Sequence, residues 1–277
     1  MTALDDRWTE LADWQAQRIA DLVAQQGQAR LDQLVRTVAG IRFDFAKTHL
    51  DNAALARLTR IAAAGDYDGR RRTLFGGGLA NPTEGRAAEH SAERGEGAAE
   101  SVQRARALQK RMRSLIDAIE GGAFGEVRHL LHIGIGGSAL GPDLLIDALG
   151  RHAARYDVAV VSNVDGAALQ AVFDRFDPAT TLIAIASKTF TTTETMLNAE
   201  SALGWLRDHG VADPHGRVVA LTAYPDKAVA WGVDETRILP FAETVGGRYS
   251  LWSSIGFPAA LALGWDGFAD MLEGAAE

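Results

Sequence analysis

The sequence has no cysteine among its 277 residues. A chain without cysteine has no disulfide framework, no thiol nucleophile and no thiolate metal site. It also lacks an apolar run long enough to span a bilayer. The N-terminus lacks the basic end and following apolar run that mark a signal peptide. These absences predict a globular protein of the cytoplasm with no membrane partner.

Positive charge is scarcer than negative charge, with 28 Lys and Arg against 36 Asp and Glu and a formal net charge of −8. This balance argues against nucleic acid or an anionic membrane as the main partner. His129 and His132 are the one histidine pair with metal-like spacing, but residues three apart on a strand face opposite sides. The residues therefore predict no metal site. The hydrophobic content of 47% can fill a sizeable core.

Hydrophobic periodicity divides the chain into three regions. Residues 1–122 show near-helical spacing and are predicted to form an N-terminal helical region, including a polar loop at 76–97. Residues 123–265 alternate short apolar runs with helical stretches, which predicts an α/β domain with a parallel sheet covered by helices on both faces. Residues 266–277 predict the start of a helix, and we expect the chain to be cut inside or just after it.

About five strands are expected in this α/β domain. The apolar runs place them at 130–135, 158–161, 181–186, 218–222 and 237–241. Helical spacing places helices between them at 142–149, 167–175, 192–208 and 226–233. Ligands of such sheets bind outside the carboxyl ends of the strands, so the residues after each run are the candidates for a site.

The first candidate is the glycine-rich stretch after residue 133, where Gly134, Gly136, Gly137 and Ser138 follow a buried run. A helix is expected to start at the Gly-Pro-Asp sequence of residues 141–143, with proline at its first position. Free backbone N–H groups converge between a strand, a glycine turn and a helix start, which favours an anion site. An ordinary strand-to-helix connection is the alternative.

The same glycines allow a nucleotide interpretation. Gly134, Gly136 and Ala139 fit the pattern G-x-G-x-x-A of dinucleotide-binding folds. Such folds also need an acidic residue about 20 residues further on, at the end of the next strand. The chain has Ser162 and Asn163 there, with Asp165 slightly late. A nicotinamide-dependent oxidoreductase is therefore a weak alternative.

The second candidate is the hydroxyl-rich stretch after residue 186, which contains Ser187, Lys188, Thr189 and Thr192. Thr191 and Glu194 have the spacing of a capping box and predict that a helix starts there. Hydroxyls, backbone N–H groups and one ammonium suit a phosphate monoester, with Lys188 as a point charge. The alternative is a hydroxyl-rich turn with a solvated lysine.

The third candidate spans residues 245–258, where Gly246 and Gly247 precede Arg248. Ser250 is predicted to cap an apolar helix over 251–263. An arginine fixed after two glycines at a helix entrance can stabilise a developing oxyanion, although a structural ion pair is the alternative. A fourth polar cluster at 81–86 is by its physics only a turn.

Taken together, these stretches resemble the phosphoglucose isomerase family. The resemblance covers the chain from about residue 43 to its end, and the matching stretches occur in the family's order. It implies a sugar-isomerase-like (SIS) domain and the interconversion of glucose 6-phosphate and fructose 6-phosphate in glycolysis and gluconeogenesis. The reaction would pass through a cis-enediolate without metal or nucleotide cofactor. The matching stretches are IGIGGSALGP at 133–142, SKTFTTTET at 187–195, GGRYSLWSSIG at 246–256 and NPTEGRAAEH at 81–90.

The resemblance also implies roles for individual residues. Arg248 would stabilise the enediolate as the catalytic residue of this chain. The substrate, a small sugar phosphate, would be bound by Gly137, Ser138, Ser187, Lys188, Thr189, Thr192 and Gly247. Full-length members are commonly homodimers.

The sequence departs from the family pattern at two positions. The family usually has glutamine at the position of Thr193 and an apolar residue at the position of Glu89, just before His90. The family's base glutamate, ring-opening histidine and late lysine belong to a C-terminal half that this sequence does not include. We therefore expect the 277-residue chain to be inactive alone. A sugar-phosphate-binding regulatory module without catalysis is the alternative function.

Overall fold

The structure, a computed structural model, describes residues 2–151 and 154–277. The chain divides into two compact units, one up to Thr73 and one of Leu74–Ala276. Within the described residues, no helix is long and apolar enough to cross a bilayer.

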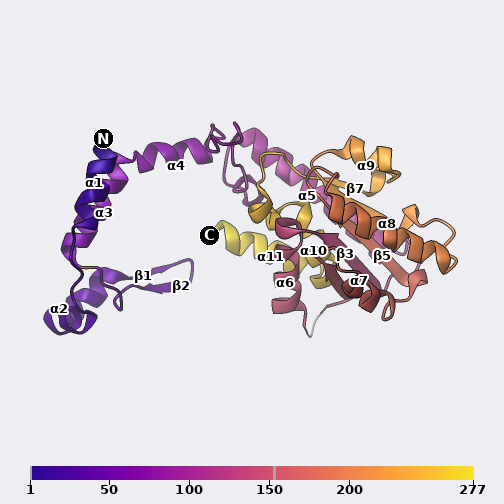
Figure 1. Cartoon of the computed structure of the whole chain (residues 1–277), viewed down its shortest axis with the longest axis horizontal. Helices are drawn as coiled ribbons and strands as arrows, with labels where there is room; N and C mark the ends of the chain where they lie inside the picture. Colours follow the sequence, from indigo (N-terminus) through magenta and orange to yellow (C-terminus); the bar gives the residue numbers. More distant parts are fainter. Residues whose placement is uncertain (1, 152–153) are drawn as a thin grey trace. The chain divides into compact units, whose positions relative to one another are not determined.

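The first unit is a group of helices with one β-hairpin (Figure 1). Its Arg30 side chain is only 2% exposed. The Arg30 guanidinium donates to the carbonyls of Ala46, Thr48 and Leu50 at 2.6–2.7 Å, which satisfies the buried charge and fixes this loop. The elements are α1 (Ala3–Ala12), α2 (Ile19–Leu34), β1 (Val35–Val38), β2 (Ile41–Asp44) and α3 (Asn52–Ala64), followed by α4 (Tyr67–Phe75).

The hairpin of β1 and β2 corrects the prediction of an N-terminal helical region. Ala39 and Gly40 both have positive φ, +48° and +73°, as the two central residues of a tight hairpin turn require. The flanking Val35, Thr37 and Val38 are β-branched, and such residues favour strands. The apolar residues of this segment fit a helix or a strand by their spacing. The turn at Ala39 and Gly40 makes the segment a hairpin.

The second unit contains a five-stranded parallel sheet. Neighbouring strands follow the order β4-β3-β5-β6-β7. Both the strand count and the parallel arrangement confirm the sequence prediction. The strands are β3 (His129–Gly134), β4 (Asp157–Val161), β5 (Thr181–Ala186), β6 (Val218–Thr222) and β7 (Ile238–Pro240).

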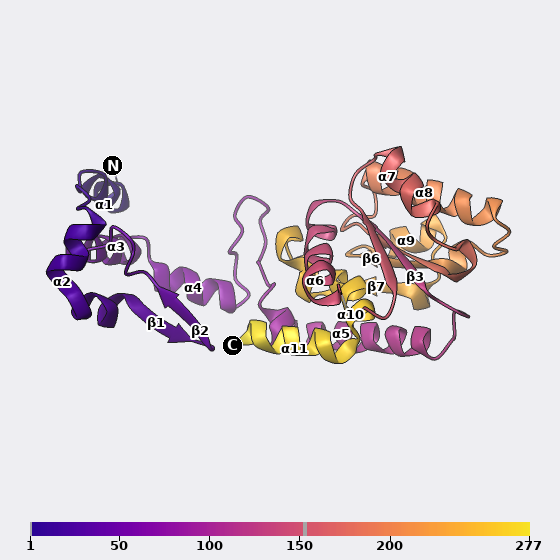
Figure 2. The same cartoon turned by 90° about the horizontal axis from the view of Figure 1, so that it is seen from below.

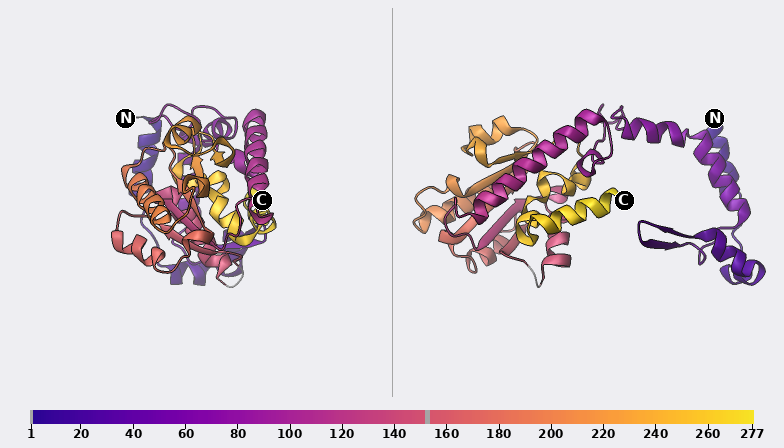
Figure 3. Two further views of the ribbon diagram at one scale, coloured as in Figure 1. Left: turned by 90° about the vertical axis from the view of Figure 1, so that its right-hand side faces the viewer. Right: turned by 180° about the vertical axis from the view of Figure 1, so that it is seen from behind.

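Two hydrophobic clusters cover the two faces of this sheet. On one face, Leu131, Ile183 and Ala220 pack with residues of α7 and α8. On the other, Leu130, Leu182 and their neighbours pack with α5, α10 and α11. Figures 2 and 3 show α5 and α11 on one side of the strands, and Figure 2 shows α7 and α8 on the other. The helices are α5 (Ala99–Glu120), α6 (Leu140–Gly150), α7 (Gly166–Phe173), α8 (Thr193–Asp208), α9 (Pro225–Trp231), α10 (Phe257–Leu263) and α11 (Trp265–Ala276).

The units divide at a different place from the predicted domains. The sequence predicts a boundary after residue 122, whereas the compact units meet between residues 73 and 74. The difference lies in α5, whose apolar face belongs to the same cluster as the sheet residues Leu130 and Leu182. Burial of Met112 and Ile116 against the sheet makes this helix one of its covering layers.

Candidate functional site

The strand order places the topological switch point of the sheet between β3 and β5. These strands are neighbours, but β3 leads to β4 on one side and β5 leads to β6 on the other. Connections that diverge in this way leave a crevice at the carboxyl ends, where ligands of open α/β sheets bind. The glycine-rich loop follows β3 and the hydroxyl-rich loop follows β5, so two of the predicted loops lie at this switch point.

The glycine-rich loop forms a 3₁₀ turn over Gly136–Ser138, with Gly136 at a φ of +58°. A Cβ on Gly137 would lie only 2.2 Å from the carbonyl carbon and oxygen of Gly247. The backbones of these two residues are therefore in direct contact. The Ser250 hydroxyl contacts both carbonyls, at 2.7 Å from Gly247 and 3.3 Å from Gly137. The first and third predicted loops thus form one surface.

Helix α6 starts at Leu140, two residues before the predicted position. The 3₁₀ turn already curls the chain, and the N–H of Asp143 bonds the carbonyl of Ala139. Pro142 is accordingly the third helical residue rather than the first. A proline is tolerated at this position because the first helical N–H groups have no partner inside the helix.

His132 lies under the glycine-rich loop and is completely buried. Its Nε2 is 2.7 Å from the carbonyl oxygen of Ser138. A carbonyl can only accept, so Nε2 carries the hydrogen and donates. Burial lowers the pKa of His132 to about 4, which keeps the ring neutral. The neighbouring His129 instead stacks on Phe176 on the other face, as the rejection of a metal pair required.

The hydroxyl-rich loop brings Ser187 and Thr192 together. Ser187 is buried and its Oγ lies 3.0 Å from Thr192 Oγ1. Between them, Phe190 has a positive φ of +52° and is buried. This strained turn points the hydroxyls of Ser187 and Thr192 at one another. The Thr189 hydroxyl accepts a hydrogen bond from Thr191 Oγ1 at 2.9 Å.

The predicted capping box of Thr191 and Glu194 is wrong. Helix α8 begins at Thr193 with Thr192 as its N-cap, one residue later than the pattern requires. Glu194 is then the second helical residue rather than the third, so it is out of register for the reciprocal bond. Thr193, which departs from the family pattern, is the first helical residue and is exposed.

Lys188 connects the second and third loops. Its Nζ donates to the carbonyl oxygens of Glu243 at 2.6 Å and Val245 at 3.2 Å. Its own carbonyl accepts from Thr222 Oγ1 and the Ala223 N–H, both at 3.0 Å. Partial burial and, to a smaller extent, the nearby Arg86 lower the pKa of Lys188, while Glu243 raises it.

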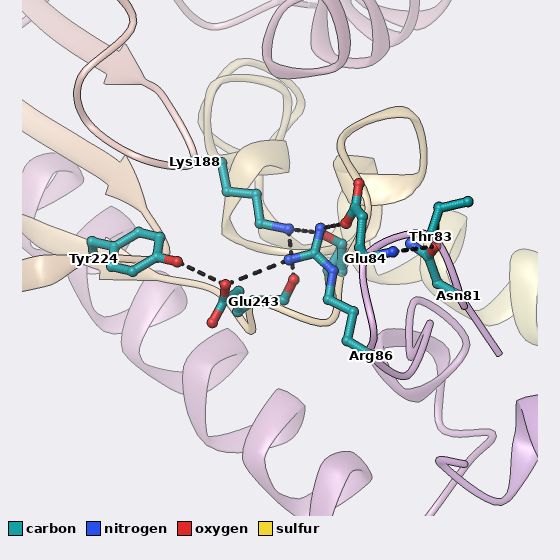
Figure 4. Close-up of polar contacts among 8 residues, drawn as sticks. Asn81, Thr83, Glu84, Arg86, Lys188, Tyr224 and Glu243 are labelled. Atoms are coloured by element: carbon teal, nitrogen blue, oxygen red, sulfur yellow. Dashed lines mark hydrogen bonds and ion pairs between the residues drawn. The ribbon is translucent and has the colours of Figure 1, made fainter. Parts of the chain in front are cut away.

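Sequence reasoning missed a polar network beside Lys188. The Tyr224 hydroxyl donates to Glu243 Oε1 at 2.7 Å, and Arg86 Nη1 lies 3.5 Å from the same oxygen (Figure 4). Arg86 is also ion-paired with Glu84. The turn at 81–86 closes by paired backbone bonds between Asn81 and Arg86, as a turn should. The only sequence signal for Tyr224 and Glu243 was that they follow the predicted strands β6 and β7, whose carboxyl ends lie at the same edge of the sheet.

Arg248 is exposed, and no described residue makes a hydrogen bond or ion pair with its side chain. The next residue, Tyr249, stacks on His90 with ring centroids 4.5 Å apart. This contact brings the fourth matching stretch against the third. Glu89, the other departure from the family pattern, is buried and accepts from Ser101 Oγ at 2.6 Å.

Ser250 does not cap the apolar helix as predicted. It lies inside a 3₁₀ helix over Gly247–Trp252, and Ser253 caps the next turn by accepting from the Ile255 N–H. The apolar helix α10 starts only at Phe257. Successive 3₁₀ turns were not predicted, because their apolar residues have nearly the same spacing as those of an α-helix.

Asp165 accepts from the Ala167 N–H and caps α7, which is a structural role for the residue that a ribose would need. In the described part of the chain, no group of three or more His, Cys, Asp or Glu residues could hold a metal ion. A shallow hollow of about 1030 Å³ lies between α5 and the segments that precede β6 and β7, away from the loops above.

Comparison with known proteins decides the family. The family model "Phosphoglucose isomerase" matches residues 44–277. The chain belongs to the phosphoglucose isomerase family. It is 73% identical to the glucose-6-phosphate isomerase of Sphingopyxis alaskensis over 277 residues, all of this chain and 55% of that protein. Identity to the Zymomonas mobilis glucose-6-phosphate isomerase is 61% over 274 residues, 99% of this chain and 54% of the relative.

A solved phosphoglucose isomerase has the same fold. The crystal structure of a glucose-6-phosphate isomerase from Chlamydia trachomatis matches with a TM-score of 0.84 and 23% identity, covering 100% of this chain and 56% of that one. At this identity the likeness concerns the fold alone. The chain spans about half the length of the relatives it matches.

Substitution of Gly137 should separate the first loop from the third. In Gly137→Ala, the new Cβ meets the Gly247 backbone, which cannot rotate away as a side chain would. We expect a loss of about 1–3 kcal/mol in unfolding free energy, typical of overpacking. Gly166→Ala is the matched control, since nothing lies within 4 Å of a Cβ there. Equal stability of the two variants in urea unfolding would contradict the contact.

His132 should make stability depend on pH. The unfolded histidine binds a proton near pH 6.5, whereas the buried one resists protonation down to about 4. The neutral His132 contributes its full share of the unfolding free energy above pH 6.5. This contribution, about 3 kcal/mol, is lost as the pH falls to about 4. Glu93, whose pKa is raised to about 7, acts in the opposite direction, so the comparison must be between variants.

His132→Gln keeps a donor for Ser138 but cannot bind this proton. Hydrogen exchange of the β3 amides between pH 4 and 7 gives the stability of both proteins. The difference in unfolding free energy between the parent and His132→Gln should become smaller as the pH falls. A constant difference would show that His132 does not titrate in this way.

Proposed function

We propose that the full-length protein is an aldose–ketose isomerase that interconverts glucose 6-phosphate and fructose 6-phosphate. The observation that carries this proposal is the meeting of three loops at the β3–β5 switch point: glycine backbone, clustered hydroxyls with an ammonium, and an arginine that no described residue pairs with. The names of the relatives support the same activity. The resemblance also implies a homodimer in the cytoplasm, and both stay predictions.

The substrate phosphate would be bound by the hydroxyl-rich loop. Ser187 and Thr192 already face one another at 3.0 Å, and Thr189 lies in the same turn. The Lys188 ammonium has three N–H donors, of which two serve the carbonyls of Glu243 and Val245. The third can point to a phosphate oxygen. Neutral donors supported by one cation suit a dianion that must also be released.

The sugar would lie against the glycine-rich loop and the third loop. Gly137, Ser138 and Gly247 offer backbone and hydroxyl groups where no side chain blocks approach. Isomerisation removes a proton from C2 of the aldose and returns one to C1, with the oxygen at C1 becoming a hydroxyl and that at C2 a carbonyl. The intermediate enediolate carries negative charge, and the unpaired guanidinium of Arg248 is suited to stabilise it.

A base must move the proton between the two carbons. None of the loops described above presents a carboxylate with a clear claim to this role, since Glu84 and Glu243 are both paired with Arg86. We therefore assign the base to the part of the full-length protein that this chain does not include. The 277-residue chain would bind the sugar phosphate without turning it over.

Binding should depend on the charge of Lys188. In calorimetric titration with fructose 6-phosphate, we expect Lys188→Ala to weaken binding roughly ten- to a hundredfold, the range for a hydrogen bond to a charged group. Binding should also weaken below pH of about 6, where phosphate gains a proton, and again as the pH rises through the lowered pKa of Lys188.

Only the alkaline loss should disappear in Lys188→Ala, because it reports the ammonium. Lys110→Ala, an exposed lysine of α5, is the control for the loss of one positive charge. A Lys188→Ala protein that binds as tightly as the parent would remove the lysine from the phosphate site.

The chain alone should show no isomerase activity. A coupled assay that detects glucose 6-phosphate formed from fructose 6-phosphate should give a rate indistinguishable from buffer, while the full-length protein turns over. Activity of the purified 277-residue chain that is abolished by Arg248→Ala would overturn the assignment of the base to the absent part.

A further inference from the structure

Glu243 occupies a point where three neighbouring strands are tied together. Its carboxylate accepts from the Tyr224 hydroxyl, just after β6, and pairs with Arg86 (Figure 4). Its carbonyl accepts from Lys188, just after β5. Glu243 itself lies three residues beyond the end of β7. The side chain and main chain of one residue thus hold groups from three separate segments.

The charges of this network balance only with Glu243 present. Arg86 and Lys188 are close enough for Arg86 to disfavour the charged lysine, and Glu243 favours it. The other groups that face them are Glu84, paired with Arg86, and the Tyr224 hydroxyl, which donates to Glu243. Without the Glu243 carboxylate, the two cations lose the anion that they share. Lys188 would then lose part of the attraction that keeps it against the third loop.

The segment after Glu243 leads directly to Arg248. Val245 is 1% exposed and packs in the core, so this end of the segment is fixed. Two glycines follow, and the backbone of Gly247 touches Gly137. The segment from Glu243 to Arg248 is therefore short and is held by contacts at Glu243, Val245 and Gly247. Lys188 grips that segment at both Glu243 and Val245.

We propose that Glu243 is a positioning residue of this site, which couples the phosphate-binding loop to the placement of Arg248. The carboxylate, held by Tyr224 and Arg86, fixes the carbonyls that hold Lys188, and the same segment carries the arginine. Binding of phosphate at the hydroxyl-rich loop and the position of the Arg248 guanidinium are then linked through the short segment from Glu243 to Arg248. This inference rests on the proposed function, because it gives Arg248 its role toward the enediolate.

A structural role alone would have a different signature. The side chain of Glu243 is 57% exposed, and ion pairs at such positions contribute little to stability. Glu243→Gln retains an acceptor for Tyr224 and should leave the unfolding free energy within about 1 kcal/mol of the parent. Its effect should instead appear in binding at the arginine, where small displacements are costly.

The test uses the full-length protein and two anionic probes. Inorganic phosphate reports the hydroxyl-rich loop, whereas arabinonate 5-phosphate carries a carboxylate in place of the enediolate oxygens. In calorimetry we expect Glu243→Gln to weaken the arabinonate phosphate about tenfold and inorganic phosphate less than threefold. Glu243→Asp, which restores the charge, should recover part of the loss. In kinetics, Glu243→Gln should lower kcat more than it raises KM.

A double-mutant cycle with Arg248→Ala decides whether Glu243 acts through the arginine. In that background, Glu243→Gln should no longer affect the affinity for the arabinonate phosphate. An equal loss with and without Arg248, or unchanged affinity in Glu243→Gln, would overturn the inference. Tyr224→Phe, which removes one hold on the carboxylate, provides a second variant and should show the same selective loss to a smaller extent.

Glu273→Gln, an exposed glutamate of α11, removes the same charge away from the network and should behave as the parent. An equal loss in this control would attribute the effect to net charge and refute the positioning role. A parent protein that neither binds fructose 6-phosphate nor isomerises it would refute the proposed function instead. The two failures are therefore distinguishable.

Discussion

The contact between the backbones of Gly137 and Gly247 is the constraint on which the candidate site depends. It joins a loop that follows the first strand of the sheet to one that follows the last, more than a hundred residues later in the chain. A side chain at Gly137 would occupy the position of the Gly247 peptide. Because the two loops touch through main chain, the backbone that leads into Arg248 is held against the loop that follows β3.

Two sets of hydrogen bonds from side chains to main-chain carbonyls also hold these loops. The neutral ring of His132, buried under the first loop, donates to the Ser138 carbonyl. Lys188 reaches across from the second loop to the carbonyls that precede Gly246. Both use donors on side chains to fix acceptors on main chain, so the groups at the switch point stay available. Donors that are held in place before a ligand arrives cost little to organise when it binds.

The sheet was predictable from the sequence because its strands are buried on both faces. The run Thr181–Ala186 is apolar apart from its first residue and was placed to the residue. The loops after the strands were found for a related reason, since in a parallel sheet the carboxyl ends mark where ligands bind. The hairpin at Val35–Asp44 was missed because Ala39 gave no sign of the positive φ that the turn needs.

What could not be predicted was the pairing of side chains across segments. Glu243 and Tyr224 are ordinary surface residues in the sequence, and only the spatial order of β5, β6 and β7 brings them to Lys188. The lysine was predicted as a point charge for phosphate, with a solvated lysine as the alternative, whereas two of its donors serve the third loop. Its placement shows why a cation near a phosphate site has two tasks. An ammonium surrounded only by hydroxyls would be free to swing into solvent between ligands, and ordering it again would weaken binding. Carbonyl acceptors hold it in position without neutralising its charge, so the attraction for a phosphate dianion is retained.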